Sequence, residues 1–398
     1  MCLGETLGLP GIGSVRPGLR IIALVTDAFG GLGGIAQYNR DFLSALAGCE
    51  EVCEVIILPR VCASSPGSLP SGVRQLHPVK GRIAYSFTAL QTARKLGVID
   101  IVFCGHLFMV PLAAFVAKLV RAHLWVQIHG IEAWQELPRL HQRSIETAAL
   151  ATSVSRYTRQ RFLRWAALDP TRVKVLPNTV NPCFRPGPKP VELLDRYNAH
   201  GKKVLITVSR LARSEQYKGH DQVIRSLPRV LVEEPDAIYV IVGDGDDRPR
   251  LEALCAEFAV ADKVRFAGSV ALEELAEYFR LADVFVMPST GEGFGIVFLE
   301  AIASGLYVIG GNRDGSLDAL CNAEAATAID PRNCDELVSA IIVALTNPTR
   351  IYNGDDKFNF RFFARHLQAL LEVCSSKVEL LDGKVIASIK WCFSATPK

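Results

Sequence analysis

Two glutamates eight residues apart, Glu292 and Glu300, are the residues of this chain best placed to do chemistry together. They lie in DVFVMPSTGEGFGIVFLEAIASGLYVIGG (283–311), where an apolar run leads into a glycine-broken turn, a helical run and a second apolar run. Ligands of open α/β sheets bind at the carboxyl ends of the strands. A helix that begins there offers free backbone N–H groups to an anion. Acidic acceptors beside such a cradle predict a polyol attached to a phosphate, as in a sugar nucleotide.

Two basic residues follow another strand-like run in the same half. KVLITVS (203–209) leads to Arg210, and Lys218 precedes a helix that opens near His220. An arginine binds phosphate oxygens bidentately, while a lysine acts as a point charge, so the pair suits a diphosphate. A solvated basic loop is the alternative. Their position at the same predicted sheet edge as Glu292 favours the diphosphate clamp.

A glycine cluster follows the first strand-like run. In AFGGLGGIAQYNR (28–40), Gly33 and Gly34 directly precede a helical run. Glycines there allow the backbone to approach a ligand closely. The segment loosely matches the dinucleotide fingerprint, but the next strand ends in Pro59-Arg60 and lacks the acidic residue that holds an adenosine ribose. A simple helix–strand packing turn remains the alternative.

The segment QIHGIEAW (127–134) ends a further strand of the first half. We expect His129 and Glu132 to project toward the same edge as the glycine cluster. A structural histidine at a strand end is the alternative to a ligand-binding one.

Asp244 and Asp246 form a D-x-D sequence, which chelates a metal in one class of sugar transferases. They lie between a buried strand and a helix, beside Gly243. We therefore interpret the segment as a tight strand-to-helix turn with an aspartate N-cap, with metal binding as the alternative. No His, Cys and Asp set has zinc spacing. We expect neither a metal nor a cofactor.

The apolar runs predict two doubly wound parallel-sheet domains that face a cleft, because strands buried on both faces read as continuous apolar stretches. The Pro- and Asn-rich segment 177–190 cannot continue a strand or helix. The predicted organisation is a leader (1–18), a first domain (19–180), a linker (181–190), a second domain (191–372) and a tail (373–398). The predicted strands are RIIALVT, CEVIILP, DIVFCG, HLWVQIHG, LATSVS, RVKVLP, KVLITVS, AIYVIVG, KVRFAG, DVFVMP and YVIGG.

The bulk composition agrees with a two-domain enzyme. The chain has 398 residues, 49% of them hydrophobic, which is enough for two cores. A net charge of +3 does not suggest a nucleic-acid partner. The eleven cysteines are scattered, the start lacks a secretory signal pattern, and the longest apolar run is too short to span a bilayer. We expect a cytoplasmic protein.

Together these motifs resemble the large retaining glycosyltransferase family 4, of GT-B fold. The resemblance rests on GG-x-GG-I, HG-I-E, SR…KGHD, VGDGDD, VRFAG and E-G-F-G-(x)4-E, over roughly residues 19–372. It implies transfer of a hexose-type sugar from a UDP- or GDP-sugar to a glycan or polyprenyl-linked acceptor. It also implies that the transfer retains anomeric configuration without a metal.

The resemblance assigns roles to particular residues. His129 would lie beside the transferred sugar, Glu292 would bind its hydroxyls, Glu300 would hold the ribose, and residues 265–267 would lie against the base. The implied catalytic residues are His129, Arg210, Lys218 and Glu292. The implied donor-binding residues are Gly33, Gly34, Arg210, Lys218, Gly243, Arg265, Phe266, Glu292, Gly293, Phe294, Gly295 and Glu300.

The chain departs from this family at Leu306-Tyr307, where Gly-x-Pro is common, which puts the local backbone in doubt. The rival functions are a sugar-nucleotide epimerase of the same fold, an NAD-dependent oxidoreductase and an inactive sugar-nucleotide sensor. The stretch 80–97 has apolar Ile83, Phe87 and Leu90 with basic ends. It predicts either peripheral contact with anionic lipid at the inner face of a membrane or a plain amphipathic helix.

Overall fold

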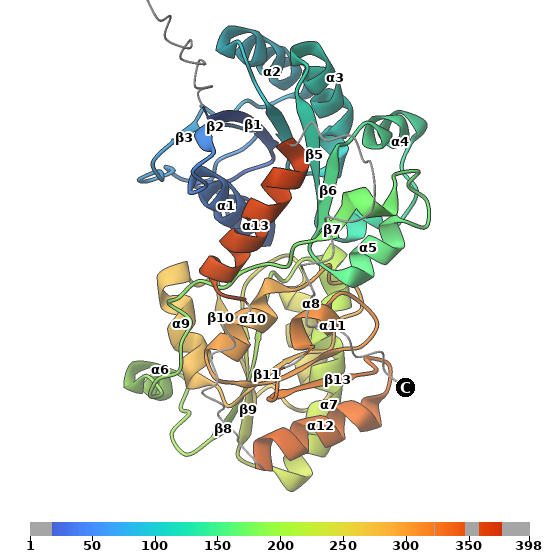
Figure 1. Cartoon of the computed structure of the whole chain (residues 1–398). Helices are drawn as coiled ribbons and strands as arrows, with labels where there is room; N and C mark the ends of the chain where they lie inside the picture. Colours follow the sequence, from blue (N-terminus) through green and yellow to red (C-terminus); the bar gives the residue numbers. More distant parts are fainter. Residues whose placement is uncertain (1–17, 322, 347–357, 376–398) are drawn as a thin grey trace, which may run out of the picture.

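A computed structural model describes residues 18–321, 323–346 and 358–375, which form two α/β domains (Figure 1). The first domain contains β1 (Leu19–Val25), α1 (Gly34–Ala47), β2 (Val52–Pro59), β3 (Val73–Gln75), α2 (Arg82–Leu96), β4 (Ile101–Cys104), η1 (Leu107–Met109), α3 (Val110–Val120), β5 (His123–Ile128), η2 (Ile131–Ala133), α4 (Arg139–Glu146), β6 (Leu150–Ser153), α5 (Arg156–Phe162), η3 (Pro170–Arg172) and β7 (Val173–Val175).

The second domain contains α6 (Val191–Arg196), β8 (Lys203–Val208), η4 (Arg213–Lys218), α7 (His220–Glu233), β9 (Ala237–Val242), α8 (Arg248–Glu257), β10 (Val264–Gly268), α9 (Leu272–Leu281), β11 (Val284–Met287), α10 (Ile296–Ala303), β12 (Tyr307–Gly311), α11 (Ser316–Leu320), β13 (Ala326–Ile329) and α12 (Cys334–Thr346). A last helix, α13 (Phe360–Ser375), follows.

Both sheets are parallel. In each sheet the strands are first added toward one edge, and the chain then crosses back to add the remaining strands toward the other edge. The first runs β3-β2-β1-β4-β5-β6-β7 and the second β10-β9-β8-β11-β12-β13. Strand β1 shows why its sequence is apolar throughout: Ile21 and Ala23 pack on the face that α1 covers, while Ile22 and Leu24 pack on the face that α2 and α3 cover. Side chains of a strand alternate between faces, so a doubly covered strand needs both sets to be apolar.

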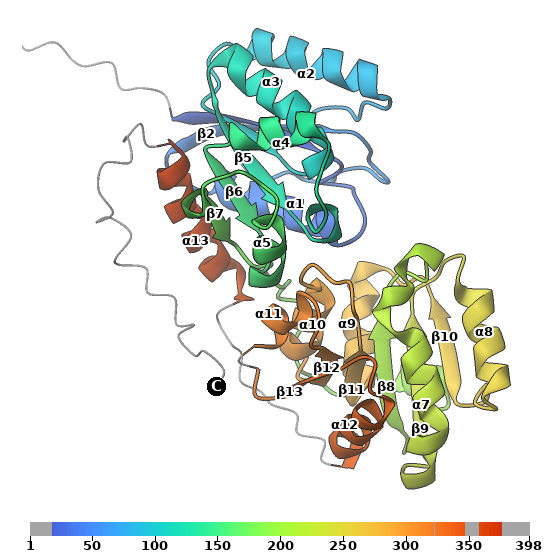
Figure 2. The ribbon, with the colours of Figure 1, turned by 90° about the vertical axis from the view of Figure 1, so that its right-hand side faces the viewer.

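The carboxyl ends of the two sheets face each other across the junction between the domains. Figure 2 shows α10 and α11 of the second domain directed toward α5 of the first. This arrangement places the residues that follow β1, β4 and β5 opposite those that follow β8 and β11. The predicted GT-B architecture of two doubly wound domains is therefore present.

Each predicted strand forms, and two further strands, β3 and β13, were not predicted. Strand β3 has three residues and lies at the edge of its sheet, so it carries little apolar signal. The Leu306-Tyr307 departure leaves β12 intact. Leu306 is buried, and Tyr307 pairs in register with Val284 of β11 while its hydroxyl contacts the Thr327 hydroxyl at 2.5 Å.

The prediction that the second domain extends to residue 372 is wrong, because α13 packs on the first domain (Figure 1). The ring of Phe363 lies edge-on to Tyr38 of α1 at 6.0 Å, and Leu367 and Leu371 join the same buried cluster. Apolar spacing predicts a helix but does not say which sheet the helix will cover. The leader up to residue 17 and the tail from residue 376 lie outside the described residues.

Candidate active site

The loop after β11 is shaped by a buried aspartate, Asp314. One carboxylate oxygen accepts from the Ser289 hydroxyl at 2.9 Å and from the Glu292 backbone N–H at 2.7 Å. The other accepts from the Ser316 N–H at 3.0 Å. A carboxylate that accepts several N–H and O–H groups fixes the chain around it. Asp314 therefore sets the position of Glu292. Asp314 was not singled out in the sequence analysis, because Glu292, whose N–H donates to it, lies 22 residues away along the chain.

Glu292 faces Lys218 in a largely buried ion pair. Their side chains are 15% and 14% exposed, and Lys218 Nζ lies 3.5 Å from Glu292 Oε1. Burial raises the pKa of Glu292, and the charge of Lys218 opposes that rise. The two residues that the sequence placed on separate loops are thus brought together at the carboxyl edge of the second sheet.

Arg210 and Lys218 are joined by Glu215, which the sequence analysis did not single out. Glu215 Oε2 lies 3.3 Å from Lys218 Nζ, and Glu215 Oε1 pairs with the Arg210 guanidinium. The two cations differ in exposure, since the Arg210 side chain is 76% exposed and that of Lys218 only 14%. Both predicted clamp residues therefore lie around one carboxylate.

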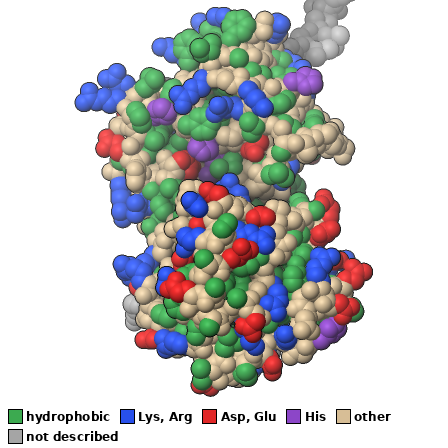
Figure 3. Space-filling view, turned by 180° about the vertical axis from the view of Figure 1, so that it is seen from behind, with side chains coloured by type: hydrophobic (Ala, Val, Ile, Leu, Met, Phe, Trp, Pro, Cys, Tyr) green, Lys and Arg blue, Asp and Glu red, His purple; other side chains and the backbone are tan. Residues whose placement is uncertain are grey.

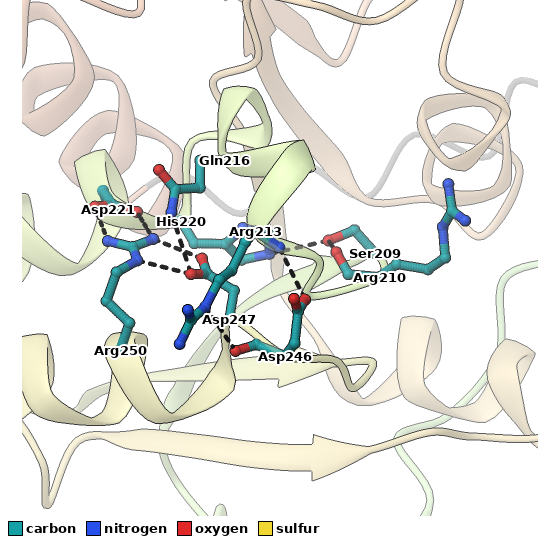
Figure 4. A network of polar contacts seen from close by, with 9 residues as sticks. All are labelled: Ser209, Arg210, Arg213, Gln216, His220, Asp221, Asp246, Asp247 and Arg250. Atoms are coloured by element: carbon teal, nitrogen blue, oxygen red, sulfur yellow. Dashed lines mark hydrogen bonds and ion pairs between the residues drawn. The ribbon is translucent and has the colours of Figure 1, made fainter.

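Figure 4 shows the Arg210 side chain directed away from a polar network that fixes the neighbouring loops. In that network Arg250 forms ion pairs with Asp221 and Asp247, at 2.6 Å each. Gln216 donates to Asp247 at 3.1 Å. These bonds fix α7, α8 and η4 relative to one another, and η4 carries Lys218.

The D-x-D residues are engaged by the chain itself. Asp246 accepts from the Arg213 N–H at 3.0 Å, and Asp244 accepts from the Gly245 N–H at 2.8 Å and lies 3.5 Å from the Arg248 guanidinium. In the part of the chain that the structure describes, no group of three His, Cys, Asp or Glu residues is arranged to hold a metal.

Gly243, at the start of the same turn, meets a packing constraint. A Cβ there would lie 1.8 Å from the Ser209 carbonyl oxygen, at a φ of +130°. Only a glycine fits this position. The close approach of the Ser209 carbonyl therefore explains why residue 243 is a glycine, since two loops pack against each other at this sheet edge.

The start of α10 provides backbone donors beside Glu292. Gly295 precedes the helix with a φ of +80°, and Phe294 is buried at 2% exposure. Among the described residues, the N–H groups of Phe294 and Gly295 have no hydrogen-bond partner. Unsatisfied N–H groups at a helix start attract anions.

Glu300 lies one turn into α10, where it is partly buried and has no cationic partner among the described residues. Burial raises the pKa of Glu300 to about 8, and repulsion by Asp41 of α1 adds to the rise. Asp41 is itself partly buried, and this desolvation raises its pKa to about 6. Glu300 of the second domain therefore lies close enough to Asp41 of the first for the Asp41 charge to raise its pKa.

The glycine cluster forms an open turn on the first-domain side. A Cβ at Gly33 or Gly34 would meet nothing within 4 Å, and Gly33 has a φ of +87°. Arg40 of α1 holds the turn by donating to the carbonyls of Ala28 at 3.0 Å and Gly31 at 2.8 Å. The backbone of Gly33 and Gly34 therefore borders free space, as a close approach to a ligand requires.

His129 is neutral and has a defined tautomer. Its Nε2 lies 2.9 Å from the carbonyl oxygen of Gly105, which can only accept, so Nε2 carries the proton. Burial lowers the pKa of His129 to about 4. Nδ1 is left as an acceptor. Figure 3 shows His and acidic side chains on the edge of the first domain that faces the second.

Arg265 and Phe266 lie on the edge strand β10, away from the Lys218–Glu292 pair along the sheet. Arg265 donates to the Asp262 carbonyl at 2.7 Å, and the Arg248 guanidinium lies over the Phe266 ring, with 5.4 Å between Cζ and the ring centroid. The arrangement gives this edge an aromatic ring beside cationic groups.

Comparison with known proteins identifies the class that this fold and site define. The model of the glycosyl transferases group 1 matches residues 194–357, and that of Glycosyltransferase Family 4 matches residues 32–183. Anabaena HepE in complex with UDP-glucose superposes with a TM-score of 0.72 at 18% identity, covering 89% of this chain and 99% of that one. A Rickettsia africae glycosyltransferase superposes with a TM-score of 0.69 at 17% identity, covering 89% and 98%.

Similarity to characterised sequences extends over most of the chain. A GDP-mannose-dependent alpha-(1-6)-phosphatidylinositol monomannoside mannosyltransferase from Mycobacterium tuberculosis is 31% identical over 83% of this chain and 90% of its own length. Its counterpart from Mycolicibacterium smegmatis is 29% identical over 80% and 87%. The chain belongs to the group 1, family 4 glycosyltransferases and is a glycosyltransferase of GT-B fold. None of these four proteins is named as an oxidoreductase or an epimerase.

The raised pKa of Glu300 predicts a pH dependence of stability. In the unfolded chain the carboxyl group ionises near its ordinary value of 4.5, whereas in the fold it stays protonated up to about 8. The contribution of Glu300 to the stability of the ligand-free protein is therefore fully present below pH 4.5 and is lost as pH rises from 4.5 to 8. Glu300→Gln removes this loss, so its melting temperature should exceed that of the wild type at pH 8 and match it near pH 4.5.

Melting curves at several pH values test this expectation, with Glu257→Gln, a change at an exposed carboxylate of α8, as the control. Parallel melting profiles of wild type and Glu300→Gln across the whole range would contradict it.

Lys218→Ala should lower kcat/KM for sugar transfer by about 100-fold or more, because it removes a buried cation and leaves Glu292 unpaired. Steady-state rates with a nucleotide-sugar donor measure the loss. Arg213→Ala, which removes an exposed cation from the same segment, is the matched control and should stay within about threefold of wild type. Transfer by Lys218→Ala within about twofold of wild type would contradict the clamp.

Proposed function

We propose that this glycosyltransferase transfers mannose from GDP-mannose to a lipid-linked phosphoinositol or glycan acceptor, with retention and without a metal ion. The observation that carries the proposal is the buried Lys218–Glu292 pair, which lies beside the free N–H groups that start α10. The mannosyltransferases that are similar over most of the chain support the choice of donor and acceptor.

Each end of the donor has matching groups in this proposal. Lys218 and Arg210 bind the diphosphate together with the backbone of Gly33 and Gly34, and Glu300 accepts hydrogen bonds from the ribose hydroxyls. Glu300 has a high pKa when the site holds no donor, and hydrogen bonds from the ribose hydroxyls would favour its ionised form on binding.

At the sugar end, Glu292 accepts from sugar hydroxyls and the free Nδ1 of His129 accepts from another. The N–H groups of Gly293, Phe294 and Gly295 add donors beside Glu292. Phe266 and Arg265 lie against the base at the β10 edge. These roles follow the chemistry of each group, with carboxylates and Nδ1 as acceptors and backbone N–H groups as donors.

The proposed chemistry follows from where charge develops. Departure of the nucleoside diphosphate places negative charge on the phosphates, which Lys218, Arg210 and the start of α10 stabilise. The acceptor hydroxyl attacks from the same face and gives its proton to the departing phosphate, so configuration is retained. Asp244 and Asp246, already engaged by N–H groups and Arg248, are not needed as metal ligands.

On the acceptor side, Arg60 follows β2 and lies over the ring of Phe108, with 5.0 Å between Cζ and the ring centroid. Its side chain makes no ion pair with a carboxylate among the described residues. A guanidinium free to bind phosphate bidentately suits an acceptor that carries a phosphodiester. The ring of Phe108, 43% exposed, offers a face to the ring of a sugar or inositol.

GDP should raise the melting temperature more than UDP, and labelled mannose should pass from GDP-mannose to phosphatidylinositol monomannoside, with activity unchanged by EDTA. Protection by UDP alone would contradict the proposed donor, and loss of transfer in EDTA with recovery in manganese would contradict the metal-free mechanism.

Arg60→Ala should raise the acceptor KM about tenfold with little effect on the donor KM, since it removes a charged phosphate contact.

We further propose that the protein is cytoplasmic and meets the inner face of a membrane through α2. The inward face of this helix is buried at Tyr85, Ala89 and Ala93, yet Ile83 and Phe87 on the outer face are 88% and 66% exposed. A shallow hollow beside them is lined by Phe87, Leu90, Gln91, Arg94 and Lys95. Apolar and basic side chains occur together at this end of the molecule (Figure 3).

A helix with exposed apolar residues and basic residues in its last turn suits the surface of an anionic bilayer. Among the described residues, no helix is long and apolar enough to cross a bilayer.

Vesicle sedimentation tests this contact. The wild type should co-sediment with phosphatidylglycerol vesicles more than with phosphatidylcholine vesicles. The double variant Ile83→Glu and Phe87→Glu should lose most of the binding, because it removes apolar area and adds negative charge. Val232→Glu, at a 78% exposed apolar residue of α7, is the matched control. Equal binding by the double variant and the wild type would contradict the α2 contact.

A further inference from the structure

The loop that carries Glu292 is held by the first domain through the carbonyl group of Gly293. Ser155 Oγ donates to this oxygen at 2.6 Å, and Thr158 Oγ1 lies 3.3 Å from it. Both hydroxyls belong to the start of α5, in the other domain. A carbonyl oxygen has two lone pairs, so these two hydroxyls satisfy it fully.

The same glycine is enclosed by backbone on its other sides. A Cβ at Gly293 would lie 2.0 Å from the His129 carbonyl oxygen and 2.8 Å from the Cα of Gly130. A Cβ at Gly315 would lie 2.0 Å from the Gly293 carbonyl oxygen. The peptide around Gly293 therefore fits between the two domains without room for a side chain.

A second contact fastens the same end of α5. Asp318, on α11, accepts from the Arg156 N–H at 2.8 Å and from the Tyr157 N–H at 3.2 Å, and it pairs with the Arg156 guanidinium. The Asp318 side chain is 10% exposed. These bonds join residues more than 160 positions apart and cross from one domain to the other.

We propose that Ser155 and Asp318 are positioning residues for the donor site, which is complete only when α5 is docked on the second domain. Neither residue needs to touch the donor. Ser155 acts through the Gly293 carbonyl, which orients the N–H groups of the following residues and the neighbouring Glu292. Asp318 keeps α5 in the place where Ser155 and Thr158 reach that carbonyl. This inference rests on the proposed function, since it assigns the donor to the Glu292 loop.

Asp318→Ala is the sharpest test, because the hydrogen bonds that its carboxylate accepts among the described residues all come from the first domain. The Kd for GDP, measured by titration calorimetry, and the donor KM should rise about tenfold, the effect of losing a charge-assisted contact. The kcat at saturating donor should change less than KM. Asp335→Ala, which removes an ion pair with Arg229 inside the second domain, is the control and should leave both values unchanged.

Ser155 provides an independent variant pair. Ser155→Ala removes the hydroxyl and should also raise the Kd for GDP, while Ser155→Thr keeps a hydroxyl and should restore it. Melting temperatures show whether either variant is simply less folded, because Ser155 also accepts from the Thr158 N–H at 3.0 Å. A donor Kd that is unchanged in both Asp318→Ala and Ser155→Ala would overturn the proposal.

Failure of the proposed function would be recognisable separately. A wild type that binds neither GDP nor UDP would contradict the donor assignment, and the docking of α5 on the second domain would then be judged by small-angle X-ray scattering. A larger radius of gyration for Asp318→Ala than for the wild type and for Asp335→Ala supports the docking of α5. Equal radii would overturn it.

Discussion

The close approach of two backbones, at Gly130 in the first domain and Gly293 in the second, is the constraint on which the site depends. Each is a glycine at a sheet's carboxyl edge, and a Cβ on Gly293 would overlap the His129 carbonyl oxygen. Because nothing bulky separates the two edges, His129 and Glu292 come to lie beside the same space. A larger residue at either glycine would push the sheets apart and separate the two halves of the site.

The charges of the site show how the second domain prepares for an anion. Lys218 lies between Glu215 and Glu292, so its charge is balanced in the resting protein. Asp314 is satisfied by N–H and O–H donors and needs no cation. Glu300 is the exception, since burial and the nearby Asp41 keep it protonated near neutral pH. The acidic groups of the site are therefore stabilised in three different ways: by the ion pairs with Lys218, by hydrogen-bond donors to Asp314, and by protonation of Glu300.

Much of the fold was predictable because its signals are local. Continuous apolar runs identified every strand of the two sheets except the edge strands β3 and β13, and the Pro-rich segment 177–190 identified the passage between domains. The glycine turn at 30–34 and the basic residues after β8 were likewise placed at the correct sheet edges. Glycine conformations and strand burial depend on neighbours in sequence, which a single chain displays directly.

The remaining features depend on contacts between distant residues. Glu215 reads as one more acidic residue of a polar loop until the fold brings Arg210 and Lys218 around it. Asp314 and Ser155 are ordinary loop residues in sequence, and their partners are known only once the loops and domains are assembled. The helix α13 was predicted as a helix but assigned to the wrong domain, because its apolar face matches either sheet equally well.

The position of α13 has a mechanical consequence. The chain passes from the first domain to the second after β7 and returns before α13, so two covalent connections join the domains. They run side by side at one point, where the Val180 N–H and the Thr179 hydroxyl both donate to the Phe358 carbonyl, at 3.0 and 2.8 Å. Two connections that are hydrogen-bonded to each other restrict rotation of one domain relative to the other more than a single linker would.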